Sequence, residues 1–316
     1  MRTTSNEVWP ALRVDDWADT RDTLHMWMQI VGKLRLARAP MVNHWWQVTL
    51  YVSARGLTTS AIPYDRGTFD IEFDFIDHQL VIRSCTGARH RINLEPQTVA
   101  AFYEEVMAAL HALGIDITIL ARPVEVECAI PFAEDTTHAA YDRDHANTFW
   151  RQLVAADRVL NRFRGEFVGK ASPVHFFWGA MDLAYTRFSG RTAPPHPGGA
   201  PNCADWVMVE GYSHELASTG FWPGGSAEGS FYAYAYPEPD GYAQTPIRPQ
   251  AGYYDASLHE FLLPYEAVRT ADDPESTVLE FLRSTYDAAA DTAGWDREIA
   301  PLRGAPATTT TPTRTP

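Results

Sequence analysis

The sequence has few cysteines and no long apolar run. Its three cysteines, Cys85, Cys128 and Cys203, are far apart and form no CxxC or other metal-ligating spacing, so neither a disulfide framework nor a zinc ribbon is indicated. No stretch of about 18 uncharged apolar residues occurs, and the N-terminal segment lacks the apolar core of a signal peptide. We therefore expect a soluble cytoplasmic protein with no membrane partner.

Basic residues are also scarce. The chain has 26 Lys and Arg residues against 40 Asp and Glu residues, a net charge of -14, and the basic residues are scattered singly. A phosphate backbone would be repelled, so a nucleic-acid partner is not expected. GxSxG, Walker, Rossmann and cysteine-nucleophile signatures are all missing, which disfavours the usual hydrolases and dinucleotide enzymes.

The sequence does have the composition of a globular protein. Hydrophobic residues make up 45% and charged residues 21% of the 316 positions, enough for one large unit or two. Residues 1–8 are expected to be a flexible N-terminus. Residues 301–316 are rich in Thr and Pro and predict a disordered tail.

The first half contains segments with the periodicity of regular elements. Residues 20–39 repeat apolar side chains at helical spacing and end before Pro40, whereas residues 44–53, HWWQVTLYVS, alternate as a half-buried strand does. Residues 68–75, TFDIEFDF, alternate most clearly and lead through a turn into the strand LVIRS. Residues 95–114 are an amphipathic helix ending at a glycine.

The second half repeats this order. Residues 144–165 predict a helix, residues 174–190, VHFFWGAMDLAYTRFSG, a strand-like run that again begins near a histidine, and residues 273–295 a closing helix that parallels residues 95–114. An α+β chain of this length also yields some such pairings by chance. We favour an internal duplication.

These patterns predict an α+β protein of two related halves. Each half is a helix, several antiparallel strands and a helix, and the halves pack about a pseudo-two-fold axis with the helices covering one face of curved sheet. Residues 9–130 form the first half and residues 131–300 the second half of the same compact unit. The sequence leaves the oligomeric state open.

Histidines in phase with apolar residues are candidate metal ligands. His44 and His175 each open a predicted strand, and a duplicated fold would bring them to related positions. An imidazole on an apolar face needs a metal, a substrate or a hydrogen-bond partner, and a backbone carbonyl is the structural alternative. With His214 they could hold a divalent metal ion, which would act as a Lewis acid or activate water.

The pair His214-Glu215 is the candidate catalytic group. Adjacent residues point to opposite faces of a strand, so both can serve one site only if the backbone turns there. Gly211 and Ser213 favour a turn or a helix start, with Ser213 as the N-cap. Glu215 could act as a general base or orient a histidine. A solvated surface position is the alternative for Glu215.

Other residues are candidates for substrate binding. Arg55 and Arg187 follow the His44 and His175 strands at similar offsets and could clamp a carboxylate or phosphate, although surface arginines at strand ends are common. His196 lies in the loop APPHPGGAPN, which is either a lid or a simple connector. The aromatic clusters NHWW, HFFWG and GFWPGG favour an aromatic-lined pocket containing Trp46, Trp178 and Trp222, with a large aromatic core as the alternative.

Four longer motifs carry a resemblance. At NHWWQVTLYVSARGLTTS, SPVHFFWGAMDLAYTRFSGR, APPHPGGAPN and YSHELASTGFWPGG, the chain is similar to a family of bacterial proteins of about this length that is catalogued as a domain of unknown function. The match runs from near Trp9 to about Trp295. The resemblance implies no activity, cofactor or catalytic residue.

Two functions follow as hypotheses. In the first, the protein binds a small molecule in an aromatic-lined pocket with a His/Glu metal or acid-base site. In the second, it is a non-catalytic ligand-binding module whose histidines are structural. A protein-interaction scaffold would need an exposed apolar patch. Whether the protein is an enzyme is left open.

Overall fold

The structure, a computed structural model, describes residues 8–65 and 67–296. The predicted flexible N-terminus, apart from Val8, and the predicted tail at 301–316 lie outside these ranges. The helices of the described residues are α1 (Ala18–Arg38), α2 (Val99–Ala112), α3 (Arg143–Arg164), α4 (Asp205–Gly211), α5 (Tyr265–Arg269) and α6 (Pro274–Thr292). Short 3-10 turns are η1 (Val14–Trp17), η2 (Asn43–Trp45), η3 (Phe132–Glu134) and η4 (Tyr242–Gln244).

Twelve strands in the described residues form two antiparallel sheets, which confirms the predicted α+β class. The first sheet contains β1 (Tyr51–Val52), β2 (Gly56–Thr58), β3 (Ile62–Tyr64), β4 (Gly67–Asp74), β5 (Gln79–Ser84) and β6 (Arg89–Asn93). The second contains β7 (His175–Phe177), β8 (Asp182–Thr192), β9 (His214–Trp222), β10 (Ser230–Tyr236), β11 (Tyr253–Asp255) and β12 (Glu260–Pro264).

Both sheets are meanders in which most neighbours along the chain are also neighbours in the sheet. The first has the order β1-β2-β4-β5-β6, with β3 paired to β4, and the second has the order β11-β12-β10-β9-β8-β7. Backbone hydrogen bonds of 2.9 and 2.7 Å between Leu50 and Phe176 join the two sheets at the edges where β1 and β7 meet. The two sheets are therefore joined by main-chain hydrogen bonds.

The main helices begin where their sequences provide caps. The side chains of Thr98, Asp142 and Asp273 accept hydrogen bonds from the free amides at the first turns of α2, α3 and α6. Pro274 occupies the first turn of α6, where its missing N–H costs nothing. Gly114 follows α2 with φ of 72°, the left-handed conformation that ends a helix.

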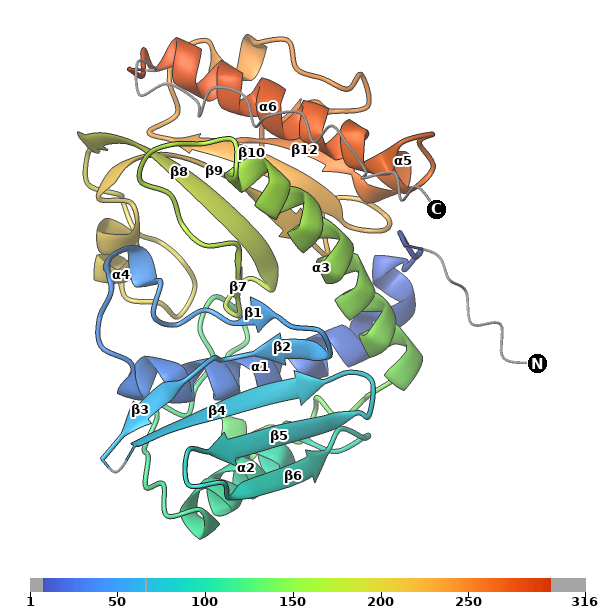
Figure 1. Ribbon diagram of the computed structural model, residues 1–316, viewed down its shortest axis with the longest axis vertical. Coiled ribbons are helices and arrows are strands. Elements are labelled where there is room, and N and C mark those ends of the chain that lie inside the picture. Colours follow the sequence, from blue (N-terminus) through green and yellow to red (C-terminus); the bar gives the residue numbers. More distant parts are fainter. Residues whose placement is uncertain (1–7, 66, 297–316) are drawn as a thin grey trace, which may run out of the picture.

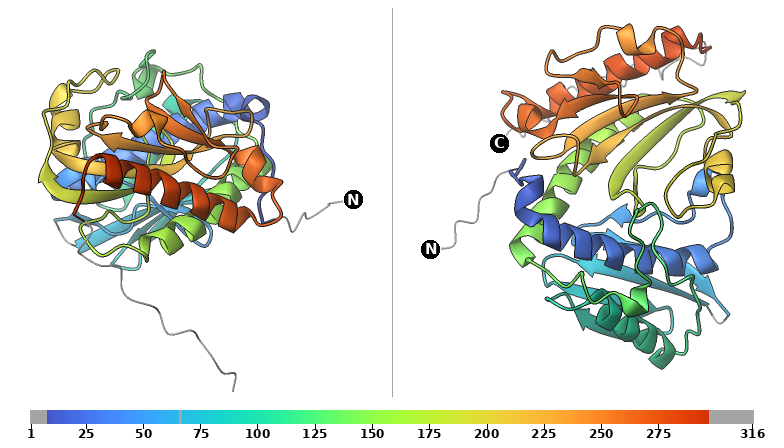
Figure 2. Two further views of the ribbon diagram at one scale, coloured as in Figure 1. Left: turned by 90° about the horizontal axis from the view of Figure 1, so that it is seen from above. Right: turned by 180° about the vertical axis from the view of Figure 1, so that it is seen from behind.

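Helices cover one face of each sheet, and α3 runs alongside both halves (Figure 1, Figure 2). Helices α1 and α2 pack on the first sheet, where Trp27 stacks on Phe102 with ring centroids 4.5 Å apart. Helices α3 and α6 cover one face of the second sheet. The other face of the second sheet is left free of these long helices.

The alternation predicted for TFDIEFDF is confirmed in β4. Phe69, Ile71 and Phe73 are at most 2% exposed and face the helices, whereas Glu72 points away and forms a salt bridge with Arg83 of β5. One face of the sheet is therefore apolar and the other carries ion pairs, as a strand with a two-residue period requires.

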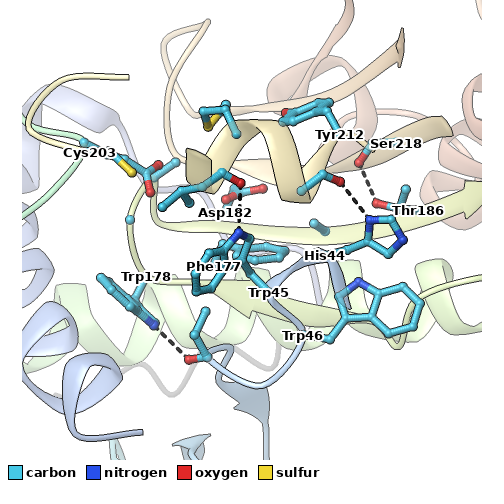
Figure 3. A pocket seen from close by; sticks show the side chains of 18 of the residues that line it. His44, Trp45, Trp46, Phe177, Trp178, Asp182, Thr186, Cys203, Tyr212 and Ser218 are labelled. Atoms are coloured by element: carbon cyan, nitrogen blue, oxygen red, sulfur yellow. Dashed lines mark hydrogen bonds between the residues drawn. The ribbon is translucent and has the colours of Figure 1, made fainter. Parts of the chain in front are cut away.

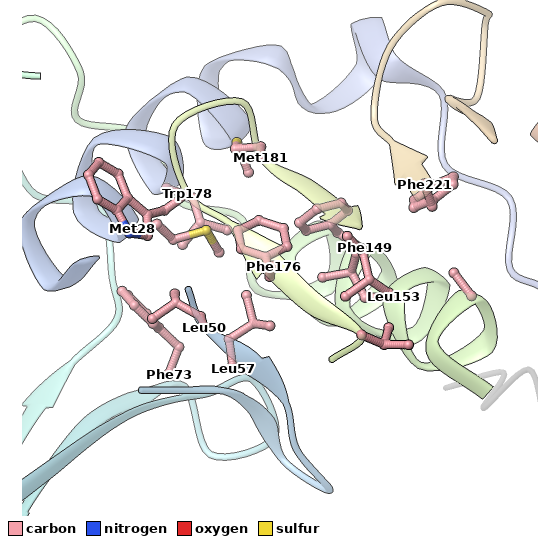
Figure 4. Packing of buried hydrophobic residues seen from close by; sticks show 14 of the residues in the cluster. Met28, Leu50, Leu57, Phe73, Phe149, Leu153, Phe176, Trp178, Met181 and Phe221 are labelled. Carbon is pink, nitrogen blue, oxygen red and sulfur yellow. The ribbon is translucent and has the colours of Figure 1, made fainter. Parts of the chain in front are cut away.

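The core is continuous from one half to the other (Figure 4). Leu50 and Leu57 of the first half lie beside Phe176 of β7 and Phe149 of α3. The indole N–H of Trp178 donates a 2.8 Å hydrogen bond to the carbonyl of Val48.

Helix, meander and helix follow one another in both predicted halves of the chain. The internal duplication and the division between residues 130 and 131 stay predictions.

Two predicted strands are wrong in detail. Residues 44–50 are not a strand, because His44 and Trp45 have φ of 59° and 61° in the η2 turn, and only Tyr51–Val52 is extended. Contact with α4 explains these conformations, because the Trp45 indole donates a 2.8 Å hydrogen bond to the carbonyl of Val207. Residues 174–190 are two strands, β7 and β8, separated by a turn that contains Met181 with φ of 58°.

Candidate functional site

A cavity of about 590 Å³ lies on the face of the second sheet that α3 and α6 do not cover (Figure 3). The opposite wall comes from the η2 turn, α4, the end of α1 and the loop around Glu125, so both halves contribute. In Figure 3, His44 and Trp46 lie at one end, Trp178 and Cys203 at the other, and Asp182 between them.

Strand alternation decides which side chains reach the cavity. In β8, Asp182, Ala184 and Thr186 line the cavity, whereas Tyr185 and Arg187 point to the α3 side, where both contact Phe163. The same two-residue period in the neighbouring strands brings in Leu216, Ser218 and Trp222 of β9 and Tyr232 and Tyr234 of β10.

Ten of the residues that line the cavity are Trp, Phe or Tyr. They are Trp45, Trp46, Phe177, Trp178, Phe188, Trp206, Tyr212, Trp222, Tyr232 and Tyr234. Three large apolar lining residues are exposed to solvent, namely Leu36 (38%), Trp206 (60%) and Leu258 (43%). These apolar side chains mark a rim through which the cavity communicates with the surface.

Asp182 is a half-buried carboxyl group at the start of β8. The hydroxyl of Tyr232 donates a 2.5 Å hydrogen bond to its Oδ2 atom. Burial raises the pKa of Asp182 to about 6, against the opposing effect of this hydrogen bond. The group therefore changes charge near neutral pH.

Gly220 makes this contact possible. It lies on β9 between Ala184 of β8 and Tyr232 of β10. A Cβ atom there would come within 2.1 Å of the Leu183 carbonyl oxygen and 2.6 Å of the Tyr232 hydroxyl. The missing side chain thus lets the tyrosine cross the middle strand.

Two more carboxyl groups line the same cavity. Burial, and secondarily the charge of Asp182, raises the pKa of Glu260 on β12 to about 7. The same two causes raise the pKa of Glu125 to about 7, although this residue keeps an accessible surface and the Lys33 ammonium opposes the shift. The charge of Asp182 therefore acts on both glutamates.

His44 lines the cavity but is held by protein groups. Its Nδ1 donates to the carbonyl of Gly211 (2.9 Å), so Nε2 accepts a hydrogen bond from the Lys170 ammonium (2.7 Å). Burial, and to a lesser extent the nearby Lys170 charge, lowers the pKa of His44. The ring centroid of His214 is 5.7 Å from that of His44.

His175 is fully buried in β7 and is not one of the residues that line the cavity. Its Nδ1 atom contacts the Thr49 hydroxyl at 3.2 Å, and burial lowers its pKa to about 3. Within residues 8–65 and 67–296, no three His, Cys, Asp or Glu side chains are grouped so that they could hold a metal ion. This arrangement gives the His44, His175 and His214 metal set no support, and metal binding stays a prediction.

His214 and Glu215 diverge. Of the two alternatives predicted there, a turn is found and a helix start is not, because α4 ends at Gly211, the chain turns at Tyr212 and Ser213, and β9 begins at His214. Consecutive strand residues point to opposite faces, and Glu215 pairs with Arg191 (2.7 Å) and accepts from the Ser189 hydroxyl (2.9 Å). Neither His214 nor Glu215 lines the cavity.

The predicted substrate-binding residues separate into two groups. Trp46, Trp178 and Trp222 line the cavity. Arg55 instead pairs with Asp74 (2.5 Å) and Asp77 (2.8 Å) on the outer face of the first sheet.

Arg187 and His196 also lie outside the lining. Arg187 is 4% exposed, and its Nη2 donates to the carbonyl of Phe163 (2.6 Å) on the helix side of β8. It lies within the strand, whereas the sequence placed it after the strand. His196 packs against Tyr212 with tilted rings whose centroids are 4.6 Å apart, and His196 is not among the residues that line the cavity.

Sequence reasoning missed the carboxyl groups and the tyrosines beside them. Asp182 is in phase with Ala184 and Thr186, and Tyr232 is in phase with Tyr234, so the signal was the strand alternation. It could not be used without knowing which strand face the helices cover. Glu125 lies in a loop, where no periodic pattern of the sequence marks it as a site residue.

The described part of the chain has no helix whose length and apolar character would suit a membrane span. No curated protein and no solved structure gives a match to the chain. The model of a family of unknown function, DUF5996, matches residues 9–301. The predicted membership of a family of unknown function is confirmed, and the chain belongs to the DUF5996 family.

Proposed function

We propose that this protein binds a small molecule in the cavity beside the second sheet. The observation that carries the proposal is the cavity itself, because protein interiors are otherwise close-packed and a space of about 590 Å³ is in the range of ligand sites. Aromatic walls with a few polar groups are typical of such sites. The tryptophans Trp46, Trp178 and Trp222 supply part of that wall.

Helix α4 is suited to act as a cover for the ligand. It follows the proline- and glycine-rich loop at 193–202, contributes Trp206 and Met208 to the lining, and leaves Trp206 60% exposed at the rim. Hydrogen bonds join it to the η2 turn, from the Trp45 indole to the Val207 carbonyl and from the His44 backbone N–H to the Glu210 carboxylate. Local opening at α4 would admit a ligand without unfolding the sheets.

Filling the cavity tests the proposal. Ala184 faces the cavity from β8, so Ala184→Trp places an indole in the ligand space. Val154→Trp on the outer surface of α3, where Val154 is 37% exposed, is the matched control. We expect the uncharged dye N-phenyl-1-naphthylamine to bind wild type and the control with enhanced fluorescence, and Ala184→Trp to weaken binding at least tenfold.

The proposal fails if the dye does not bind wild-type protein, or if Ala184→Trp binds it as tightly as the control does. Circular dichroism and the melting temperature of each variant establish that the fold is kept.

A second candidate function is general acid-base catalysis by Asp182. The contact between Asp182 and Tyr232 at the cavity wall, with the pKa of Asp182 raised to about 6 by burial, favours it, because a base that titrates near neutral pH is well suited to proton transfer. The probe reaction is the ring opening of 5-nitrobenzisoxazole, in which a base removes the C3 proton as the N–O bond breaks to give a cyanophenolate.

Wild-type protein should accelerate this reaction over buffer, with a rate that rises as pH increases through about 6. Asp182→Asn should abolish the acceleration while dye binding persists. A non-catalytic binding module would bind the dye and give no acceleration that depends on Asp182.

A further inference from the structure

The cavity has more negative than positive groups in its lining. Glu125, Asp182 and Glu260 contribute three carboxyl groups, whereas Lys33 is the one Lys or Arg among the described residues that line it. His44 does not balance the charge of these carboxylates. Its Nδ1 donates a hydrogen bond to a carbonyl and its Nε2 accepts one from Lys170, so the ring is neutral. The charge of the lining is thus unbalanced.

Lys33 interacts electrostatically with one of the three carboxyl groups, that of Glu125. Its ammonium lies 5.8 Å from the centroid of the Trp178 ring. Asp182 and Glu260 form no salt bridge with any residue that the structure describes. A half-buried carboxylate without a positive partner is costly, so a cation supplied by the ligand would stabilise both.

The surroundings of these two carboxyl groups fit an organic cation. Tyr232 and Tyr234 stack with centroids 6.1 Å apart beside Asp182 and Glu260, and Trp178 and Phe177 belong to the same lining. The carboxyl groups are spread around the cavity rather than gathered as a metal-ion cage would be. Aromatic faces attract a positively charged nitrogen and pack against its apolar substituents.

We propose that the ligand of this cavity is an organic ammonium compound with an apolar or aromatic body, whose positive nitrogen lies between Asp182, Glu260 and the ring of Tyr232. This inference rests on the proposed function, since it names the ligand class of the same cavity. Lys33 already places an ammonium group near Trp178 and Glu125, and a ligand would place a second one near Asp182 and Glu260.

Three indole compounds of similar shape test the charge preference. Tryptamine carries an ammonium group, tryptophol a hydroxyl and indole-3-acetate a carboxylate. Each is used at pH 8 to displace N-phenyl-1-naphthylamine from wild-type protein, from Asp182→Asn, from Glu260→Gln and from the control Glu266→Gln. Glu266 lies on α5, is exposed and does not line the cavity.

We expect tryptamine to bind wild type and the control at least tenfold more tightly than tryptophol, and indole-3-acetate to bind more weakly than either. Asp182→Asn and Glu260→Gln should each reduce the preference for tryptamine over tryptophol by about fivefold or more, whereas Glu266→Gln should keep the wild-type preference. Cation–π and charge-assisted contacts are of this size.

The inference is overturned if the dye binds and tryptophol displaces it as well as tryptamine does, or if the preference survives both substitutions. In that case the cavity binds neutral ligands and the proposed function stands. If the dye does not bind wild-type protein at all, both the proposed function and the inference fail.

Discussion

The hydroxyl of Tyr232 on β10 reaches over Gly220 of the middle strand and donates a 2.5 Å hydrogen bond to Asp182 on β8. This contact connects three strands at the floor of the cavity. It also holds a carboxyl group, whose pKa burial raises to about 6, in a defined orientation. The electrostatic behaviour of the cavity therefore depends on a tyrosine and on a glycine that makes room for it.

Removing the hydroxyl tests this relationship. Because the Tyr232 hydrogen bond favours the ionised carboxylate, Tyr232→Phe should raise the pKa of Asp182 above about 6. Titration of the side-chain carboxyl carbon by NMR gives the value. An unchanged or lower pKa would contradict the geometry, and Tyr253→Phe, an exposed tyrosine outside the cavity lining, should leave the Asp182 titration as in wild type.

Neutralising Glu260 should stabilise the protein at high pH. Burial raises the pKa of this carboxyl group from 4.5 to about 7 in the folded protein, because folding favours its neutral form. The resulting stabilisation of the folded protein is complete below pH 4.5 and is lost as the pH rises through about 7. We expect the melting temperature of Glu260→Gln, relative to wild type, to be at least about 2 °C higher at pH 8 than at pH 5. The exposed control Glu266→Gln should show no such gain. If Glu260→Gln changes the melting temperature equally at pH 8 and pH 5, Glu260 is not a buried carboxyl group without a positive partner.

The burial of His175 should give the stability of the protein the opposite pH dependence. Its pKa is lowered from 6.5 to about 3 by burial, so its stabilising effect is complete above pH 6.5 and is lost as pH falls towards 3. Between pH 8 and pH 5 this costs about 2 kcal/mol of unfolding free energy. His175→Gln should lose correspondingly less stability over that range in urea denaturation.

The control for this measurement is Thr49→Val, which removes the hydroxyl beside His175 but keeps the ring buried. Because desolvation is the main cause of the lowered pKa, Thr49→Val should keep the wild-type pH dependence. If His175→Gln and wild type lose stability in parallel, His175 is not buried in its neutral form.

Arg187 should be a structural residue. Its guanidinium carbon lies 3.5 Å from the centroid of the Phe163 ring and 4.3 Å from that of Tyr286, and its Nη2 donates to the Phe163 carbonyl. We expect Arg187→Ala to lower the unfolding free energy by about 3 kcal/mol, with dye affinity unchanged under conditions where the variant is folded. The exposed Arg191→Ala, which breaks a surface ion pair with Glu215, should cost less than about 1 kcal/mol. Loss of dye binding by a stable Arg187→Ala would restore the predicted role in substrate binding.

The long helices and the central strands could be predicted because each has one apolar face. Residues of β4 alternate between the helix side and the ion-paired side, and α2, α3 and α6 carry visible caps at Thr98, Asp142 and Asp273. The region around His44 could not be predicted this way. Contacts with α4, more than 160 residues away in the sequence, force His44 and Trp45 into left-handed backbone conformations there.

The aromatic part of the cavity was visible in the sequence, whereas its charged part was not. Trp46, Trp178 and Trp222 stand in conspicuous aromatic clusters and line the cavity. Asp182 and Glu260 look like ordinary polar positions on strands, because only the packing of α3 and α6 determines which face of the sheet encloses a space. The histidines were conspicuous as well, but His44 and His175 are held by Lys170, a backbone carbonyl and Thr49.

A crystal structure of the protein grown with saturating tryptamine would show directly whether the cavity binds an organic ammonium compound. We expect electron density for one molecule inside the cavity, with its indole against the aromatic wall and its ammonium group at salt-bridge distance from Asp182 or Glu260. A cavity that remains empty, with tryptamine on the surface or nowhere, would contradict this expectation.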